Sequence, residues 1–146
     1  MYLLREGMES DLLQIAELER LIFTDAWSLH GLRETFAQPR ALLEVAEEEG
    51  SIQGYAIVYD VVGEAEIARI AVAESSRKAG VGSALLEKVC EWCIQRDAHK
   101  LLLDVRNGDQ TAVSFYRHLG FTEDGIRKGF YEKPKEDALL MSKQLP

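Results

Sequence analysis

The stretch IARIAVAESSRKAGVGSAL, residues 67–85, runs from an apolar strand through a turn into an amphipathic helix. Amides in the first turn of a helix lack intrahelical partners, and the aligned peptide dipoles leave partial positive charge there, so this junction favours a bound anion. Arg77 adds a cation, while Gly80 and Gly82 remove the β-carbons that would hold a phosphate away from the backbone. The stretch therefore predicts a strand-turn-helix unit that binds a nucleotide-like cofactor.

The same two glycines also suit a tight strand-to-helix turn without a ligand, and their spacing does not separate the two interpretations. The pattern lacks the third glycine of the dinucleotide-binding fingerprint. It also lacks the Gly-Lys-Ser or Gly-Lys-Thr that closes a phosphate-binding P-loop. Both of these phosphate sites are therefore disfavoured.

Size and composition indicate one globular domain over residues 1–146. The chain is 47% hydrophobic and 29% charged, and its apolar runs are too short to cross a bilayer, so we expect no membrane partner. The N-terminal residues are acidic where a secretory signal is basic and then apolar, which favours a cytoplasmic protein. A net charge of −8 disfavours nucleic acid and favours cationic partners such as basic peptides or polyamines.

Metal chemistry is not predicted. Cys90 and Cys93 form a lone CxxC inside a helical segment, and the three histidines lack ligand spacing. The acidic run at residues 47–49 is interpreted as a solvated hairpin connection without a function of its own.

Hydrophobic periodicity predicts a mixed α/β architecture. Ser10 or Asp11 is placed to cap a first helix, and Ser28 to cap a second that ends before Pro39. The other helices are expected at 80–96 and 110–119, and strands at 41–46, 52–61, 65–73, 100–106, 121–132 and 137–144. The one parallel crossover of this order runs through the glycine-bearing turn.

Three segments together resemble the GNAT acetyltransferase family: IAVAESSRKAGVGSALL (70–86), LLLDVRNGDQTAVSFYRHLGF (101–121) and IRKGFYEKPKEDALLMSKQL (126–145). The resemblance spans essentially the whole chain. It implies the acyl-CoA N-acyltransferase fold, a mostly antiparallel sheet of about six to seven strands flanked by four helices. The second and third segments look like the bacterial RimI type, which acetylates the N-terminal alanine of a small-subunit ribosomal protein.

This resemblance implies a binding mode for acetyl-CoA. The RxxGxG run starting at Arg77 matches the family's pyrophosphate loop. Backbone groups of Ile70, Ala71 and Val72 would bind the acetyl carbonyl and the pantetheine arm, and the amides of Lys78, Ala79, Gly80, Val81, Gly82 and Ser83 would hold the pyrophosphate. Asp109 replaces an asparagine that contacts the cofactor in the family, and Asn107 is the residue expected to take over that contact.

Asp104 is the candidate general base, because attack on a thioester requires a neutral amine. It interrupts the apolar run LLLDV, and its apolar neighbours predict that the carboxylate is buried in the sheet. The alternative is that Asp104 faces solvent or pairs with Arg106. RimI-type enzymes usually have glutamate here, so Asp104 would end about 1.5 Å short of the amine, a gap that a water could bridge. Glu64, at the start of the strand that leads to the cofactor turn, is the competing base.

Tyr116 occupies the position of the family's general acid, which protonates the departing thiolate. From the residues alone, Tyr116 also fits a packing role, because Val113, Tyr116 and Leu119 fall on one helical face. The resemblance adds Trp27 and Tyr131 as residues of the loops expected to bind the acceptor. A helix-flanking core aromatic is the alternative for Trp27.

Three functions remain open. The first is transfer of acetyl from acetyl-CoA to a protein N-terminus, with Asp104 as base and Tyr116 as acid in a ternary complex. The second keeps acetyl-CoA and changes the acceptor to a lysine, a polyamine or another small amine. The third is an acyl-CoA-binding module without turnover, motivated by the substitutions at Asp104 and Asp109. The oligomeric state, monomer or dimer, is not readable from the sequence.

Overall fold

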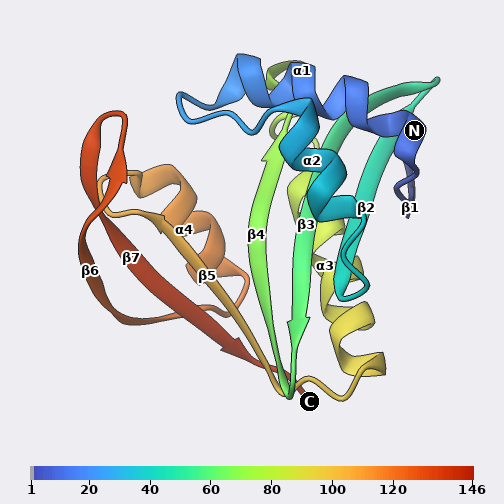
Figure 1. Cartoon of the computed structure of the whole chain (residues 1–146). Helices are drawn as coiled ribbons and strands as arrows, with labels where there is room; N and C mark the ends of the chain where they lie inside the picture. Colours follow the sequence, from blue (N-terminus) through green and yellow to red (C-terminus); the bar gives the residue numbers. More distant parts are fainter. Residues whose placement is uncertain (1) are drawn as a thin grey trace.

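Seven strands form one sheet within residues 2–146, the part of the chain that the computed structural model describes (Figure 1). The sheet order is β1-β2-β3-β4-β5-β7-β6, and neighbours are antiparallel except for the parallel pair β4 and β5. The strands are β1 (Leu3–Glu6), β2 (Ala41–Glu48), β3 (Ser51–Val61), β4 (Glu64–Val72), β5 (Lys100–Arg106), β6 (Thr122–Glu132) and β7 (Lys135–Gln144). The α-helices are α1 (Leu12–Ile22), α2 (Leu29–Phe36), α3 (Val81–Gln95) and α4 (Gln110–His118). The predicted mixed sheet with four flanking helices is therefore confirmed.

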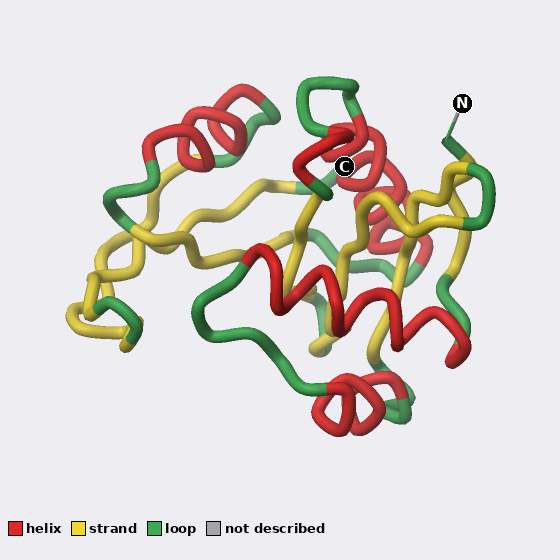
Figure 2. The backbone as a smooth tube through the Cα atoms, turned by 90° about the horizontal axis from the view of Figure 1, so that it is seen from above, coloured by secondary structure: helices red, strands yellow, loops and turns green. Residues whose placement is uncertain are grey.

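The helices cover both faces of the sheet, α1 and α2 on one side and α3 and α4 on the other (Figures 1 and 2). Each face has its own core. Leu42 and Leu43 are consecutive in β2 but join opposite cores, because successive side chains of a strand point to opposite faces. Leu42 packs with α3 residues such as Val89, and Leu43 packs with α1 residues such as Ile15. This alternation gives the sheet its two buried faces.

The N-terminal strand β1 is the element that the sequence pattern did not predict. It has only four residues, LLRE, and pairs with β2 from Leu3↔Glu47 to Glu6↔Glu44. Arg5 fixes this edge through ion pairs of 2.8 Å to both Asp11 and Glu47. Four residues are too few for an alternating pattern to stand out, so the strand depends on its register with β2.

Two boundaries also differ from the prediction. A 3-10 turn, η1 (Glu9–Asp11), precedes α1, and Asp11 accepts hydrogen bonds from Arg5 and from the Met8 amide instead of capping α1 with its side chain. Strand β2 extends through Glu48, so Glu49 and Gly50 alone form the turn, with φ of 51° and 82°. The capping role predicted for Ser28 is confirmed, since its Oγ accepts from the Gly31 amide at 3.1 Å.

The Arg5–Asp11 pair predicts a pH dependence of stability. The hydrogen bond from Arg5 holds the pKa of Asp11 below its ordinary value, so the pair stabilises the fold above the unfolded-state pKa, and this stability is lost as the pH falls through the lower folded-state pKa. We expect Asp11→Asn to lower the free energy of unfolding at pH 7. The difference from the wild type should shrink below about pH 4. Urea titrations of both proteins at pH 7 and pH 3 would measure it; an unchanged difference would contradict the assignment.

Strands β4 and β5 separate after a short parallel contact. In the described chain their register is limited to Glu64↔Lys100, Ala65↔Leu101 and Glu66↔Leu102. Beyond it, β4 stays paired with β3 up to Val72, and β5 stays paired with β7 up to Arg106. Figure 1 shows the two strands diverging toward those ends. The side of β4 that faces β5 is therefore an open strand edge in the middle of the sheet.

The cysteines and the possible metal ligands of residues 2–146 were also checked for a site of their own. Burial raises the pKa of Cys93 to about 12, so this thiol stays protonated inside the α3 core. Among residues 2–146, His, Cys, Asp and Glu do not gather in threes as a metal site requires. The α-helices of the same region also lack the length and apolar character that a bilayer span needs.

Candidate active site

The turn between β4 and α3 forms a cradle of unpaired amides. In the described structure the amides of Lys78–Ser83 donate no hydrogen bond, and the first bond of α3 runs from the Ala84 amide to the Gly80 carbonyl at 3.0 Å. Lys78 and Gly80 have φ of 66° and 80°, which turns these amides outward before the helix begins. Free amides at a helix N-terminus suit a phosphate, so the residues fit the pyrophosphate predicted here.

The two glycines of this turn act differently. A β-carbon on Gly80 would meet no atom within 4 Å, so Gly80 is needed for its backbone angle and leaves the cradle open. A β-carbon on Gly82 would lie 3.1 Å from the ring of Phe115 in α4, so Gly82 lets α3 approach α4. The Arg77 Nε donates to the Val72 carbonyl at 3.1 Å and leaves the rest of the guanidinium exposed beside the turn. The turn is therefore a tight strand-to-helix connection, and its open side also fits the predicted anion.

Gly50 provides a matched control for Gly80. Both residues have a φ near +80° and open space around the missing β-carbon. We expect Gly80→Ala and Gly50→Ala each to lower the free energy of unfolding by about 1–2 kcal/mol. Gly80→Ala alone should also weaken CoA binding, by about tenfold, because only that turn carries the free amides. Denaturation and calorimetric titration with CoA measure the two effects. Equal CoA affinities in the two variants would exclude the cradle.

Ile70, Ala71 and Val72 end the open edge of β4. Ala71 is buried, with 7% of its surface exposed, while Ile70 and Val72 are half-buried. All three lie beyond the register that β4 shares with β5, so backbone groups pointing toward β5 have no strand to pair with. An extended ligand could use them, as the family resemblance implies.

Asp104 lies on β5, across the gap from that edge. It is half-buried, and this corrects the expectation of a carboxylate enclosed in the sheet. Its Oδ1 accepts a hydrogen bond of 2.8 Å from the Tyr131 hydroxyl. Arg106 is not its partner, because that guanidinium pairs with Glu136 at 3.2 Å and donates to the Pro134 carbonyl at 2.8 Å. The carboxylate is therefore engaged by a phenol.

Tyr116 packs its ring and keeps its hydroxyl free. The ring contacts Phe115 and Phe121 edge to face, with centroids 5.3 and 5.6 Å apart, and 8% of the residue is exposed. Its hydroxyl has no hydrogen-bond partner among the described residues, and no unpaired polar atom of these side chains is fully buried, so the hydroxyl reaches solvent. Burial raises the Tyr116 pKa, and the charges of Asp109 and Asp104 add to this. The phenol therefore stays protonated and can donate.

Asp109 has a local structural explanation. Its Oδ1 accepts from the Ala112 amide at 3.1 Å and so caps the N-terminus of α4. Asn107, two residues earlier, is exposed, and its backbone amide donates to the Asp137 carbonyl at 3.0 Å. A carboxylate at this position thus stabilises the helix.

Glu64 is not brought to the site. It is exposed at the first residue of β4, beside Lys100 at the closed end of the β4–β5 contact. Eight residues at about 3.3 Å each put it roughly 26 Å along the strand from Val72. The competing base and substrate contact predicted at Glu64 is therefore remote from Val72, at the far end of the open edge.

A buried polar cluster, Glu19, Tyr55 and Arg69, was missed by sequence reasoning. Glu19 is 0% exposed and accepts from the Tyr55 hydroxyl and from Arg69, the latter at 2.9–3.2 Å. Two signals were available: Glu19 follows Ile15 by four positions on the inward face of α1, and Arg69 interrupts an apolar strand.

This cluster holds the connection between α1 and α2. Glu19 accepts from the Trp27 amide at 2.9 Å, and Arg69 donates to the Asp25 carbonyl at 3.0 Å. The Arg69 guanidinium also lies 3.7 Å from the centroid of the Phe23 ring and 5.2 Å from that of Trp27. Half-buried Trp27 is therefore fixed from two sides, in line with the core-aromatic interpretation of this residue.

The α1–α2 connection meets the β6–β7 hairpin. The Thr24 hydroxyl donates to the Lys133 carbonyl, and Tyr131 belongs to the same hairpin. Burial and the hydrogen bond to Asp104 raise the Tyr131 pKa. Trp27 and Tyr131, predicted separately, thus come from two segments that touch each other.

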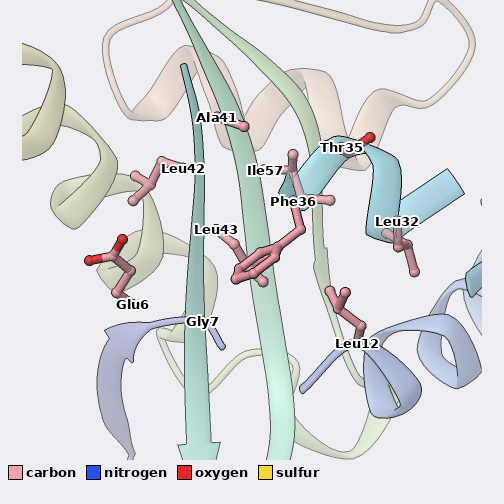
Figure 3. Close-up of a pocket in the computed structure, with 10 residues that line it drawn as sticks. All are labelled: Glu6, Gly7, Leu12, Leu32, Thr35, Phe36, Ala41, Leu42, Leu43 and Ile57. Atoms are coloured by element: carbon pink, nitrogen blue, oxygen red, sulfur yellow. The ribbon is translucent and has the colours of Figure 1, made fainter. Parts of the chain in front are cut away.

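A separate cavity of about 140 Å³ lies near the opposite edge of the sheet. It is bounded by β1, β2, α1 and α2 and is lined mainly by apolar side chains (Figure 3). Leu12, Leu32 and Phe36 point into it from the helices, and Leu43 from β2. Because β3 and β4 stand between β2 and β5, this cavity is distinct from the Asp104 region.

Residues 12–121 match the model of the acetyltransferase (GNAT) family. The chain belongs to the GNAT family. This GNAT protein is 33% identical over 132 residues to a Bacillus subtilis (strain 168) relative, covering 90% of this chain and 87% of the relative. That relative is named, provisionally, a ribosomal protein bS18-alanine N-acetyltransferase.

Escherichia coli provides two further comparisons. The strain K12 protein named ribosomal protein bS18-alanine N-acetyltransferase is 34% identical over 97 residues, 65% of the GNAT chain and 66% of that protein. The crystal structure of the ribosomal-protein-S18-alanine N-acetyltransferase from this species superposes with a TM-score of 0.92 at 28% identity. It covers 99% of the GNAT chain and 94% of its own. The predicted family, fold and N-acetyltransferase class are confirmed.

Proposed function

We propose that this protein transfers the acetyl group of acetyl-CoA to the N-terminal alanine of ribosomal protein bS18, in a direct ternary complex. The names of its relatives support this acceptor. The observation that supports the chemistry most is the β4–β5 divergence. Free amides follow the end of β4, and β5 carries Asp104, which accepts a hydrogen bond from Tyr131 of β6. This function implies work on a ribosomal protein in the cytoplasm.

The donor side is β4 and the turn after it. Acetyl-CoA, when bound, supplies an acetyl group activated as a thioester. The amides of Lys78–Ser83 and the Arg77 guanidinium would neutralise its pyrophosphate, and the open edge at Ile70–Val72 would align the pantetheine arm. Asn107 and Asp109 are proposed to lie beside the cofactor, with Asp109 acting through the α4 cap.

The acceptor side offers the Asp104 carboxylate, which suits a cationic N-terminus. Asp104 accepts a hydrogen bond from Tyr131, and the whole chain carries a net charge of −8. Acidic side chains attract a protonated amine before it loses its proton. Trp27 and Tyr131 would line the path of the peptide.

Proton transfer favours an α-amine over a lysine. The α-amino group has a pKa of about 7.7–8.0 and lysine about 10.4, so a lysine needs roughly 3–4 kcal/mol more to become neutral at the same pH. Asp104 is the proposed proton acceptor for the amine. Tyr116, whose protonated hydroxyl reaches solvent, is the proposed donor to the departing thiolate.

The test uses a peptide with the first residues of the host's bS18, beginning with alanine and containing a lysine. The protein is incubated with the peptide and acetyl-CoA, and fragmentation locates the added mass. A matched peptide with a blocked α-amine is the control. We expect a mark on the terminal amine and none on the blocked peptide. A mark on lysine, or CoA release with polyamines alone, would replace the proposed acceptor, and CoA binding without transfer would support a binding module.

A further inference from the structure

The Asp104–Tyr131 hydrogen bond bears on how a carboxylate as short as Asp104 could exchange a proton with the acceptor amine. Aspartate ends about 1.5 Å earlier than glutamate would at the same position. The Tyr131 hydroxyl lies 2.8 Å from the Asp104 Oδ1. A carboxylate only accepts hydrogen bonds, so the phenol donates its proton to Asp104 and keeps lone pairs free on its oxygen.

Tyr131 is held in place by groups other than the substrate. The Arg106 guanidinium lies 4.4 Å from the centroid of its ring, and the Phe130 ring packs edge to face at 5.1 Å. Arg106 in turn donates to the carbonyls of Lys133 and Pro134, at 3.2 and 2.8 Å, and so fixes the hairpin that carries Tyr131. The hydroxyl is therefore positioned before any acceptor binds.

We propose that Tyr131 is a catalytic residue that relays the proton of the acceptor amine to Asp104, an inference that rests on the proposed acetyl transfer. As the amine nitrogen bonds to the acetyl carbon, its N–H proton passes to the Tyr131 oxygen, and the Tyr131 hydroxyl proton passes to Asp104 Oδ1. The carbon–sulfur bond then breaks, its electron pair stays on sulfur, and Tyr116 supplies the proton that completes the thiol. Tyr131 ends unchanged, Asp104 has gained one proton and Tyr116 has lost one, and solvent restores both.

The surroundings of Tyr131 support a proton relay through a neutral hydroxyl. They do not favour a Tyr131 that is already deprotonated before the amine binds. Burial and the bond to Asp104 raise its pKa, so the hydroxyl holds its proton until Asp104 receives it. The Tyr131 hydroxyl thus takes the place of a water molecule that would otherwise link Asp104 to the acceptor amine. Unlike a water, it is held by a rigid side chain.

The experiment measures the single-turnover rate of acetyl transfer in wild type, Tyr131→Phe, Asp104→Glu and the double variant. We expect Tyr131→Phe to slow transfer by about 100-fold, the size of a typical acid–base contribution. Asp104→Glu lengthens the carboxylate into the space that the hydroxyl leaves. The double variant should therefore regain at least about tenfold over Tyr131→Phe.

Tyr59→Phe is the matched control, because it removes a half-buried tyrosine hydroxyl from β3, outside the site. Its transfer rate should stay within about twofold of wild type, and CoA affinity should be unchanged in all variants. A purely structural Tyr131 would give a double variant no faster than Tyr131→Phe, and that result would overturn the relay, as would a Tyr131→Phe rate within about threefold of wild type. If the wild type acetylates a different amine, the proposed acceptor fails, and the same four rates on that amine still decide the relay.

Discussion

Replacing Tyr116 with phenylalanine is expected to slow acetyl transfer by about 100- to 1000-fold while leaving the affinity for CoA unchanged. The ring packs against Phe115 and Phe121, and phenylalanine keeps both contacts. Only the hydroxyl is lost, and that hydroxyl makes no bond that the fold within residues 2–146 depends on. The effect should therefore fall on chemistry and spare folding and binding.

Rapid-quench measurements test the expected loss of transfer rate, and calorimetric titration with CoA tests the unchanged affinity. A thiolate that leaves without a proton donor is the physical reason for the slower step, so a more acidic thiol leaving group should partly relieve it. A Tyr116→Phe protein that transfers acetyl at the wild-type rate would remove the acid assignment and leave Tyr116 as a packing residue.

Replacing Glu19 with alanine should have the largest effect on stability, a loss of about 3–5 kcal/mol in the free energy of unfolding. Glu19 is fully buried, and its carboxylate neutralises Arg69, whose side chain is 11% exposed. Removing Glu19 leaves the largely buried Arg69 charge with only the Asp25 carboxylate, at 3.3 Å, as an ion-pair partner. It also frees the Tyr55 hydroxyl and releases the Trp27 amide. The α1–α2 connection should loosen together with the helix.

Glu17→Ala is the control on the same helix. Glu17 pairs with Arg20 on the surface, where its side chain is 57% exposed, and such pairs contribute about 1 kcal/mol or less. Urea denaturation of both variants gives the comparison. The double variant Glu19→Leu with Arg69→Met should recover part of the loss, because it removes both charges. Equal stabilities of Glu19→Ala and Glu17→Ala would contradict a structural role for the cluster.

Local patterns were enough to predict most elements, because helix caps, apolar periodicity and glycines act within a few residues. Ser28 and Gly80 are examples, since the cap and the left-handed turn depend on neighbours only. Strand β1 was not predicted because four residues are too few to show an alternating pattern. It is stabilised by residues about forty positions away, such as Glu47. The elements that depend on distant pairing were the ones that the sequence alone did not predict.

The candidate site shows the same limit. Asp104 stood out as a charge in an apolar strand, yet its partner Tyr131 is 27 positions away and is brought close by the order β5-β7-β6. Glu19 and Arg69, 50 positions apart, meet only because α1 lies across β4. Asp109 was interpreted from a family pattern, although a carboxylate three residues before Ala112 also predicts a helix cap.

The open edge of β4 also bears on how this protein avoids aggregation. A strand edge at the rim of a sheet attracts strands of other molecules, and proteins usually protect such edges with charges, bulges or covering loops. Here the exposed edge lies inside the sheet, with β5, β7 and β6 standing across from it. The strands β5, β7 and β6 occupy the side from which another sheet would have to approach it. The fold thus leaves part of an interior strand unpaired without placing that edge at the rim of the sheet.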